Sequence, residues 1–322
     1  MELLTTMNDN HKKLDAELLK HKPNDRYTGP ITPNIDLDQA CPELVANKRT
    51  ELVKLNDCRK HPFWSPKITL EQANHHFSSL QEGVKIFGSQ PDRHATITDI
   101  DPETGERIYK LVQLEPVPTD IILSFNNTWG SIREALDQMV TAAGVSCGLS
   151  KTKLSKLYFP FARDQADFLD KVAEKTDGLH ADIVSILMDS NAYKGGDDPL
   201  WAVNRISNQR KHAALSAVAA RANHISAELS KSGANFTVSD CEWDSNKNEL
   251  EYGRSAAQIT EKFDFSTLFI FDIVVDEIET IKMRPILRMT NDLISTATRL
   301  CDEIEDVCVS LGHINEKLVE PV

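Results

Sequence analysis

The stretch ILSFNNTWGSIREALDQMVTAAG, residues 122–144, has its apolar residues at the three- and four-residue spacing of an α-helix. Three polar residues, Asn126, Arg133 and Asp137, are seven and four positions apart, so they line up along one flank of that helix. The segment therefore predicts a core helix with a polar stripe beside its buried face. That face comprises Ile132, Leu136, Met139, Val140 and Ala143.

A second helix is expected in DPLWAVNRISNQRKHAALSAVAARANHISAELSKSG, residues 198–233. Asp198 followed by Pro199 is typical of a helix start, with the aspartate as cap and the proline in the first turn. We expect the helix to continue to about residue 232. Its predicted core face comprises Leu200, Val203, Ala214, Leu215 and Val218.

This second helix carries a polar stripe of its own. Successive residues of an α-helix are rotated by about 100°, which places Arg205, Asn208 and His212 along one edge of the core face. Lys211 falls within the apolar sector, where an ammonium group needs a partner or a cleft. The complete polar set is Asn204, Arg205, Asn208, Arg210, Lys211 and His212.

The two stripes allow three interpretations. If the helices pack antiparallel, Asp137 meets Lys211 or Arg205, and the amides and the imidazole complete a network. That network is either catalytic or ligand-binding, or it is a buried set of polar groups that fixes how the helices pack. The third interpretation is an ordinary solvated helix face.

The segments on either side of the helical centre predict a small antiparallel sheet. Residues 94–116, HATITDIDPETGERIYKLVQLEP, alternate in polarity around a loop with Pro and Gly, as a hairpin does. Residues 234–253 predict a second hairpin that turns at residues 245–248, and FDFSTLFIFDIVV, residues 263–275, predicts a buried strand. We therefore expect one sheet built from distant parts of the chain.

Two further helices complete the expected fold. One occupies residues 68–88, with Thr69 and Gln72 at the spacing of a capping box, and one occupies residues 285–312. The fold class is α+β, predominantly α. We expect an N-terminal extension of helices and a proline-rich connector over residues 1–65. Residues 66–322 then form the main body, with its helical core at about 120–232.

The composition excludes several classes of protein. A hydrophobic fraction of 40% and a charged fraction of 26% are those of a soluble globular protein, and the net charge of −13 opposes non-specific nucleic-acid binding. No apolar run approaches the roughly 20 residues that span a bilayer, and the N-terminus lacks the pattern of a signal peptide. We expect a cytoplasmic protein without membrane contact. The six cysteines form no C-x-x-C pair, so we expect no metal and no cofactor.

Three motifs carry a resemblance to known proteins. SIREALDQMV (131–140), YFPFARDQADF (158–168) and PLWAVNRISNQRKHAAL (199–215) resemble a group of uncharacterised bacterial proteins. These proteins share an R-x-A-L-D motif, a later F-P and an N-x-x-x-N-x-x-K-H helix, and the resemblance covers roughly residues 70–300. More loosely, the central helices resemble the HEPN superfamily, whose motif is an Arg and a His with four to six residues between them. Here six residues, ISNQRK, separate Arg205 from His212.

The HEPN resemblance implies a helical bundle, a homodimer and metal-independent cleavage of RNA, plausible for a toxin or an antiphage defence protein. In that case His212 acts as general base or acid, Arg205 and Arg210 bind the scissile phosphate, and Asn208 orients the phosphate or the imidazole. Lys211, Asn204, Arg133, Asp137 and Asn126 support them. The alternative is a non-catalytic protein that binds a partner or a small ligand, with residues 1–65 as one surface for a protein partner.

Overall fold

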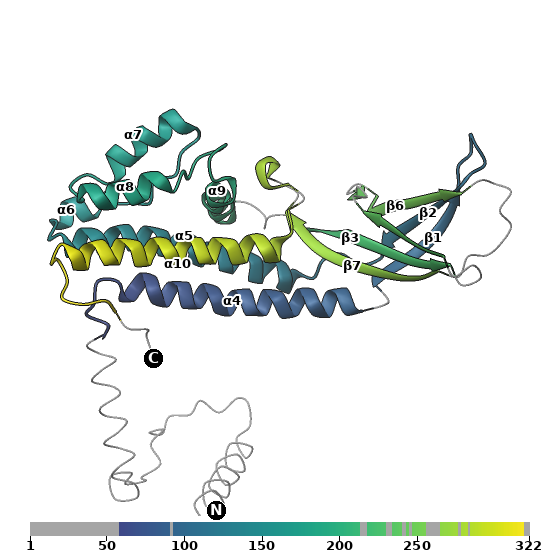
Figure 1. The fold of residues 1–322 in the computed structure, drawn as a ribbon, viewed down its shortest axis with the longest axis horizontal. Coiled ribbons are helices and arrows are strands. Elements are labelled where there is room, and N and C mark those ends of the chain that lie inside the picture. Colours follow the sequence, from purple (N-terminus) through teal and green to yellow (C-terminus); the bar gives the residue numbers. More distant parts are fainter. Residues whose placement is uncertain are drawn as a thin grey trace, which may run out of the picture. The chain divides into compact units, whose positions relative to one another are not determined.

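The computed structural model describes residues 58–90, 93–212, 218–229, 234–239, 243–244, 247–255, 265–275, 278–282 and 284–318. The predicted extension over residues 1–65 lies outside these ranges except for its last eight residues. Three long helices lie side by side along much of their length: α4 (Trp64–Ser89), α5 (Thr119–Ser146) and α10 (Ile286–Ser310) (Figure 1). Together with the small antiparallel sheets, they confirm a predominantly helical α+β fold.

The core is built on α5. All five apolar residues predicted for its buried face are fully buried, and Phe125 and Trp129 extend this face toward the start of the helix. The indole Nε1 of Trp129 donates to Thr290 Oγ1 at 2.9 Å, which ties α5 to α10 inside the core. No helix in the part of the chain that the structure describes is both long enough and apolar enough to cross a bilayer.

α4 begins earlier than predicted. Its first residue is Trp64, and Pro66 lies in the first turn, where a missing backbone N–H leaves no hydrogen bond broken. Thr69 is therefore inside the helix and does not cap it. Its hydroxyl instead donates to Gln138 Oε1 of α5 at 2.9 Å, which joins the two helices.

Four shorter helices follow α5 along the chain: α6 (Lys151–Leu154), α7 (Gln165–Lys175), α8 (Ala181–Asp189) and α9 (Asp198–His212). The start of α9 agrees with the prediction to within one residue, because the cap is Asp197, whose Oδ1 accepts from Leu200 N at 2.8 Å. Among residues 198–208 of α9, whose side chains the structure describes, the buried apolar ones are Leu200, Ala202, Val203 and Ile206.

The antiparallel packing of α5 and α9, on which the expected pairing of Asp137 depended, is not found. α9 is seen nearly end-on in Figure 1, whereas α5 runs across the picture, so the two helices cross. An apolar patch only two turns long, from Leu200 to Ile206, provides one short area of contact and cannot hold two helices together along their length. The two polar stripes therefore meet at one point.

The first sheet has the order β1-β2-β6-β5 and is built from distant segments, as predicted, but the described strands form two sheets and not the one that was expected. The hairpin β1 (His94–Ile100) and β2 (Arg107–Gln113) precedes α5, and β5 (Trp243–Asp244) and β6 (Glu249–Ser255) come far later in the chain. β2 pairs antiparallel with β6 and so joins the two hairpins.

The prediction of a helix that continues to about residue 232 is wrong for its second half. β3 (Val218–Leu229) is a strand and lies between β4 (Ala234–Ser239) and β7 (Phe265–Val275) in a second antiparallel sheet. The alanines in this segment favour a helix, but by less than about 1 kcal/mol per residue. Pairing with a strand on each side outweighs that preference. Val218 thus belongs to a strand, and Ala214 and Leu215 lie outside the described residues. The short 3₁₀ helix η2 (Glu279–Ile281) follows β7.

Candidate functional site

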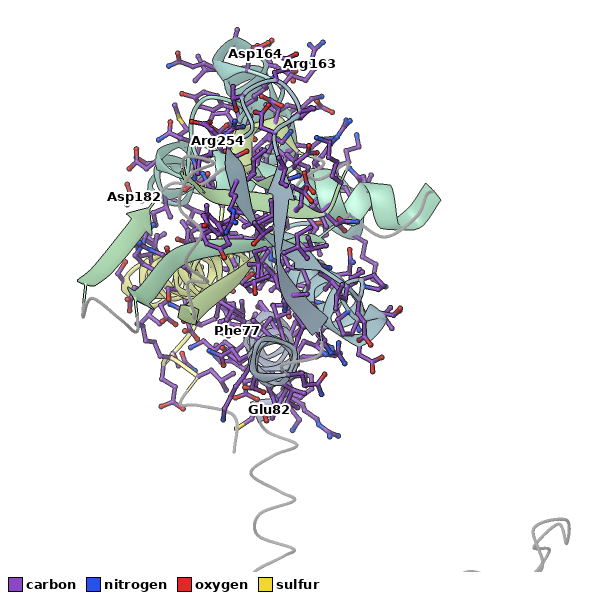
Figure 2. The ribbon with its side chains drawn as sticks, turned by 90° about the vertical axis from the view of Figure 1, so that its right-hand side faces the viewer. Phe77, Glu82, Arg163, Asp164, Asp182 and Arg254 are labelled. Carbon is purple, nitrogen blue, oxygen red and sulfur yellow. The ribbon has the colours of Figure 1, made fainter. Side chains whose placement is uncertain are left out.

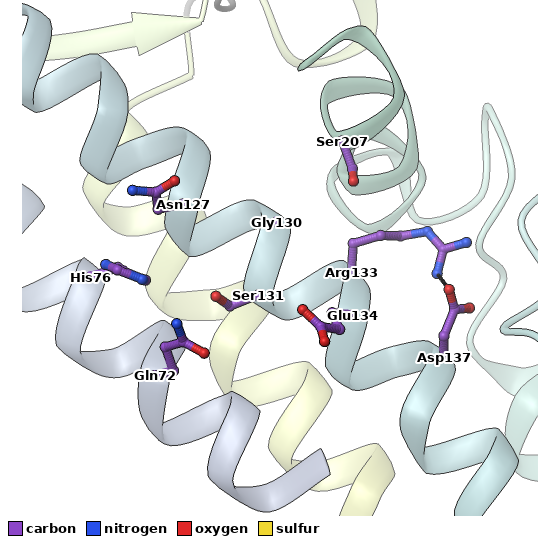
Figure 3. Close-up of a pocket in the computed structure, with 9 residues that line it drawn as sticks. All are labelled: Gln72, His76, Asn127, Gly130, Ser131, Arg133, Glu134, Asp137 and Ser207. Atoms are coloured by element: carbon purple, nitrogen blue, oxygen red, sulfur yellow. Dashed lines mark ion pairs between the residues drawn. The ribbon is translucent and has the colours of Figure 1, made fainter. Parts of the chain in front are cut away.

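The two polar stripes meet at Arg133. Its Nε donates to Asn204 Oδ1 of α9 at 3.1 Å, and its Nη1 forms an ion pair with Asp137 one turn along α5 (Figure 3). Asp137 Oδ1 also accepts from Phe159 N at 3.0 Å, and the guanidinium lies over the ring of Phe161, 4.5 Å from its centroid. These five residues, which we call the Arg133 junction, connect α5, α9 and the segment after α6.

The Arg133 junction agrees with the structural interpretation of the stripes. Each polar group in it bonds to another part of the fold, and Arg133 is only 18% exposed. The predicted pairing of Asp137 with Arg205 is wrong, since Asp137 binds Arg133 and Phe159 instead. The side chain of Lys211, the other predicted partner, lies outside the described residues.

Replacing Arg133 with alanine should lower the free energy of unfolding by about 1–3 kcal/mol. The change removes a partly buried ion pair, the hydrogen bond to Asn204 and the contact with Phe161. Urea unfolding followed by circular dichroism measures the loss. Arg299→Ala is the matched control, because Arg299 is 58% exposed and pairs with Glu303 on its own helix, so we expect less than about 1 kcal/mol. Equal losses in the two variants would rule out a structural role for the junction.

Asn126 does not join the junction. Its side chain is fully buried in α5, and Nδ2 donates to Ile122 O of the preceding turn at 2.8 Å. It lies where the sequence predicted a stripe, but burial makes it part of the core. The hydrogen bond to Ile122 stays within α5 and does not test the prediction that Asn126 supports a site on the α9 edge.

Two residues of the α9 stripe, Arg205 and Asn208, lie outside the Arg133 junction. Arg205 and Asn208 are exposed, and Asn208 Nδ2 donates to Asn204 Oδ1 at 3.3 Å. Within the described part of the chain, Arg205 forms no ion pair. The backbone of α9 is helical as far as His212, so Arg205 and His212 are two turns apart along one side of a continuous helix. The side chains of Arg210, Lys211 and His212 lie outside the described residues.

A cavity of about 550 Å³ opens between α4, α5 and α9, next to the Arg133 junction (Figure 3). α4 contributes Gln72 and His76, α5 contributes Asn127, Ser131 and Glu134, and α9 contributes Ser207. Gly130, Arg133 and Asp137 complete the lining. The wall is thus mostly amide, hydroxyl, imidazole and carboxylate.

Sequence reasoning missed this cavity, although a signal was present. Gln72 and His76 are four residues apart, and Asn127, Ser131 and Glu134 are four and three apart, so each set follows one side of its helix. The spacing identifies two more polar stripes, but which helix each one faces depends on the packing.

Comparison of the chain with protein-family models, with curated proteins and with solved structures gave no match in any of the three.

Proposed function

We propose that the chain is a metal-independent RNA endonuclease whose reaction depends on His212 and Arg205. The observation that carries the proposal is the exposed edge of α9. Arg205 is exposed and pairs with no carboxylate in the described part of the chain, and it shares one side of a continuous helix with His212. The residues of the two stripes that the fold does use, Arg133, Asp137 and Asn204, are distinct from these two.

The chemistry requires few groups. The 2′-OH of the substrate loses its proton to His212 and attacks the adjacent phosphorus, and the 5′-oxygen of the next nucleotide leaves with a proton. The products are a 2′,3′-cyclic phosphate and a free 5′-OH. An imidazole suits this role because its unperturbed pKa is about 6.5, near neutrality. Arg205, with Arg210, binds the phosphate and stabilises the charge that builds up on its oxygens. Asn208 orients the phosphate.

The HEPN resemblance extends the proposal to the setting of the reaction. A symmetric homodimer would bring two α9 edges together and supply two histidines, one as base and one as acid. A cytoplasmic toxin or antiphage defence enzyme is the setting that the resemblance favours, with residues 1–65 available to bind a protein partner.

The decisive experiment is cleavage of a single-stranded RNA by the purified full-length chain in EDTA at low ionic strength. We expect products ending in 2′,3′-cyclic phosphate. An oligonucleotide of the same sequence made entirely of DNA is the matched control and should remain intact, because it has no 2′-OH. Low salt is chosen because it leaves the contacts of Arg205 and Arg210 with phosphate unscreened. An intact RNA under these conditions would refute the enzyme proposal.

A further inference from the structure

We propose that the cavity between α4, α5 and α9 binds a small organic cation carrying an ammonium or guanidinium group. The proposal is independent of RNA cleavage, because it uses none of the exposed residues of the α9 edge. It follows from three properties of the wall: its charge, the orientation of one carboxylate, and its size.

The charge of the wall is negative once internal pairs are removed. Arg133 is the basic residue of the lining, and its guanidinium turns toward Asp137 and away from Gln72 and His76 (Figure 3). The opposite charges of Arg133 and Asp137 cancel within their ion pair. Glu134 remains, and it forms no ion pair with any residue that the structure describes. A cationic ligand therefore supplies a charge that the protein itself does not supply.

Glu134 is held in place by a chain of hydrogen bonds. Thr69 Oγ1 donates to Gln138 Oε1 at 2.9 Å, and Gln138 Nε2 donates to Glu134 Oε1 at 2.9 Å. These two hydrogen bonds connect α4 to Glu134 on α5 and orient the carboxylate before a ligand arrives. An ordered acceptor loses less side-chain entropy on binding than a free one.

The size and the remaining groups point to an organic molecule. A volume of about 550 Å³ falls within the range of small-molecule sites and is far larger than a single ion needs. Asn127, Ser131 and Gln72 present amide and hydroxyl groups on two helices, and Ser207 adds a hydroxyl from α9. These groups suit a ligand with several hydrogen-bond donors spread along its length.

The test is calorimetric titration of the full-length chain with 1,4-diaminobutane, and in parallel with 1,4-butanediol. The two probes have the same length, but only the first is a cation. We expect saturable one-to-one binding of the diamine and no saturable binding of the diol. Equal binding of both probes, or no saturation with the diamine, would overturn the proposal.

Two variants locate the site. Glu134→Gln should weaken diamine binding about tenfold, because a hydrogen bond to a charged group is replaced by one to a neutral group. Glu82→Gln is the matched control: Glu82 is also an exposed helical glutamate, but it lies on the side of α4 opposite the buried Phe77 and outside the cavity (Figure 2). Equal affinities in these two variants would contradict the proposal.

A third variant fills the cavity without changing its charge. Ser207→Leu should abolish diamine binding by occupying the space on the α9 side. Thermal unfolding of each variant verifies that the protein is folded at the temperature of the titration. Wild-type affinity in a folded Ser207→Leu protein would place the bound diamine elsewhere and refute the assignment of the cavity.

Discussion

Replacing Glu305 with alanine should destabilise the protein by about 3–5 kcal/mol, because it leaves a partly buried ammonium group without its partner. Glu305 of α10 is fully buried, and its Oε2 lies 2.6 Å from Lys67 Nζ of α4. Burial lowers the pKa of Lys67, but the hydrogen bond and the charge of Glu305, helped by Asp302, outweigh burial and keep the pKa above its ordinary value. Lys67 is therefore charged at neutral pH, and it needs that carboxylate.

The same carboxylate holds the segment that follows α10. Leu318 N donates to Glu305 Oε1 at 2.9 Å, and Lys67 Nζ donates to Leu318 O at 3.2 Å. A third hydrogen bond joins His61 Nε2 to Glu316 O at 3.1 Å. We therefore expect Glu305→Ala both to lower the urea midpoint and to expose residues 311–318 to a protease at temperatures where wild type resists.

Two controls separate charge from packing. Asp302→Ala removes the second carboxylate near Lys67, at 3.4 Å, but Asp302 is 46% exposed, so the loss should stay below about 1 kcal/mol. The double variant Lys67→Met, Glu305→Leu replaces the pair by apolar groups and should recover much of the stability. Similar losses of stability in Glu305→Ala and Asp302→Ala would show that the buried pair of Lys67 and Glu305 does not stabilise the packing of α4 against α10.

Helix faces were predictable from the sequence because burial repeats along one helix. The core face of α5 needs only the spacing of Ile132, Leu136 and Met139, and every one of them is buried. A local pattern is sufficient there, since the helix makes all of its own backbone hydrogen bonds. The same holds for the start of α9, where Asp197 and Pro199 act within one turn.

β3 could not be predicted in the same way. Its backbone hydrogen bonds go to β4 and β7, and β7 begins 36 residues after β3 ends. Nothing within residues 218–229 shows which partner strand is available, so the alanines dominated the prediction. Strand formation in this segment is a property of the whole sheet and not of the segment alone.

The sequence predicted which residues belong to the candidate site better than it predicted which of them contact one another. The sequence identified Arg133 and Asp137 as members of one stripe and Asn204 as a polar residue of the second helix, and the structure brings all three together. Which pairs form depends on the angle at which α5 and α9 cross, and helical spacing does not contain that angle. The cavity escaped prediction for the same reason, because its wall comes from three helices.

In the proposed endonuclease reaction, substitutions of Arg205 and of Arg133 should have different effects. His212→Ala should reduce the rate of RNA cleavage by about 100-fold or more, as expected for the loss of a general acid–base group. Arg205→Ala should reduce it by a similar factor, because charge on the phosphate is no longer stabilised. Arg205 is exposed, so its variant should keep wild-type stability to within about 0.5 kcal/mol.

Two readouts distinguish chemistry from structure. Added imidazole should restore part of the activity of His212→Ala, which a merely misfolded variant would not show. Arg133→Ala should give the opposite result to Arg205→Ala: lower stability, because its partners Asp137 and Asn204 lose their contacts, but near-normal cleavage per folded molecule. If Arg133→Ala abolished cleavage while Arg205→Ala cleaved normally, the reaction would belong to the Arg133 junction, and the exposed edge of α9 would be an ordinary solvated surface.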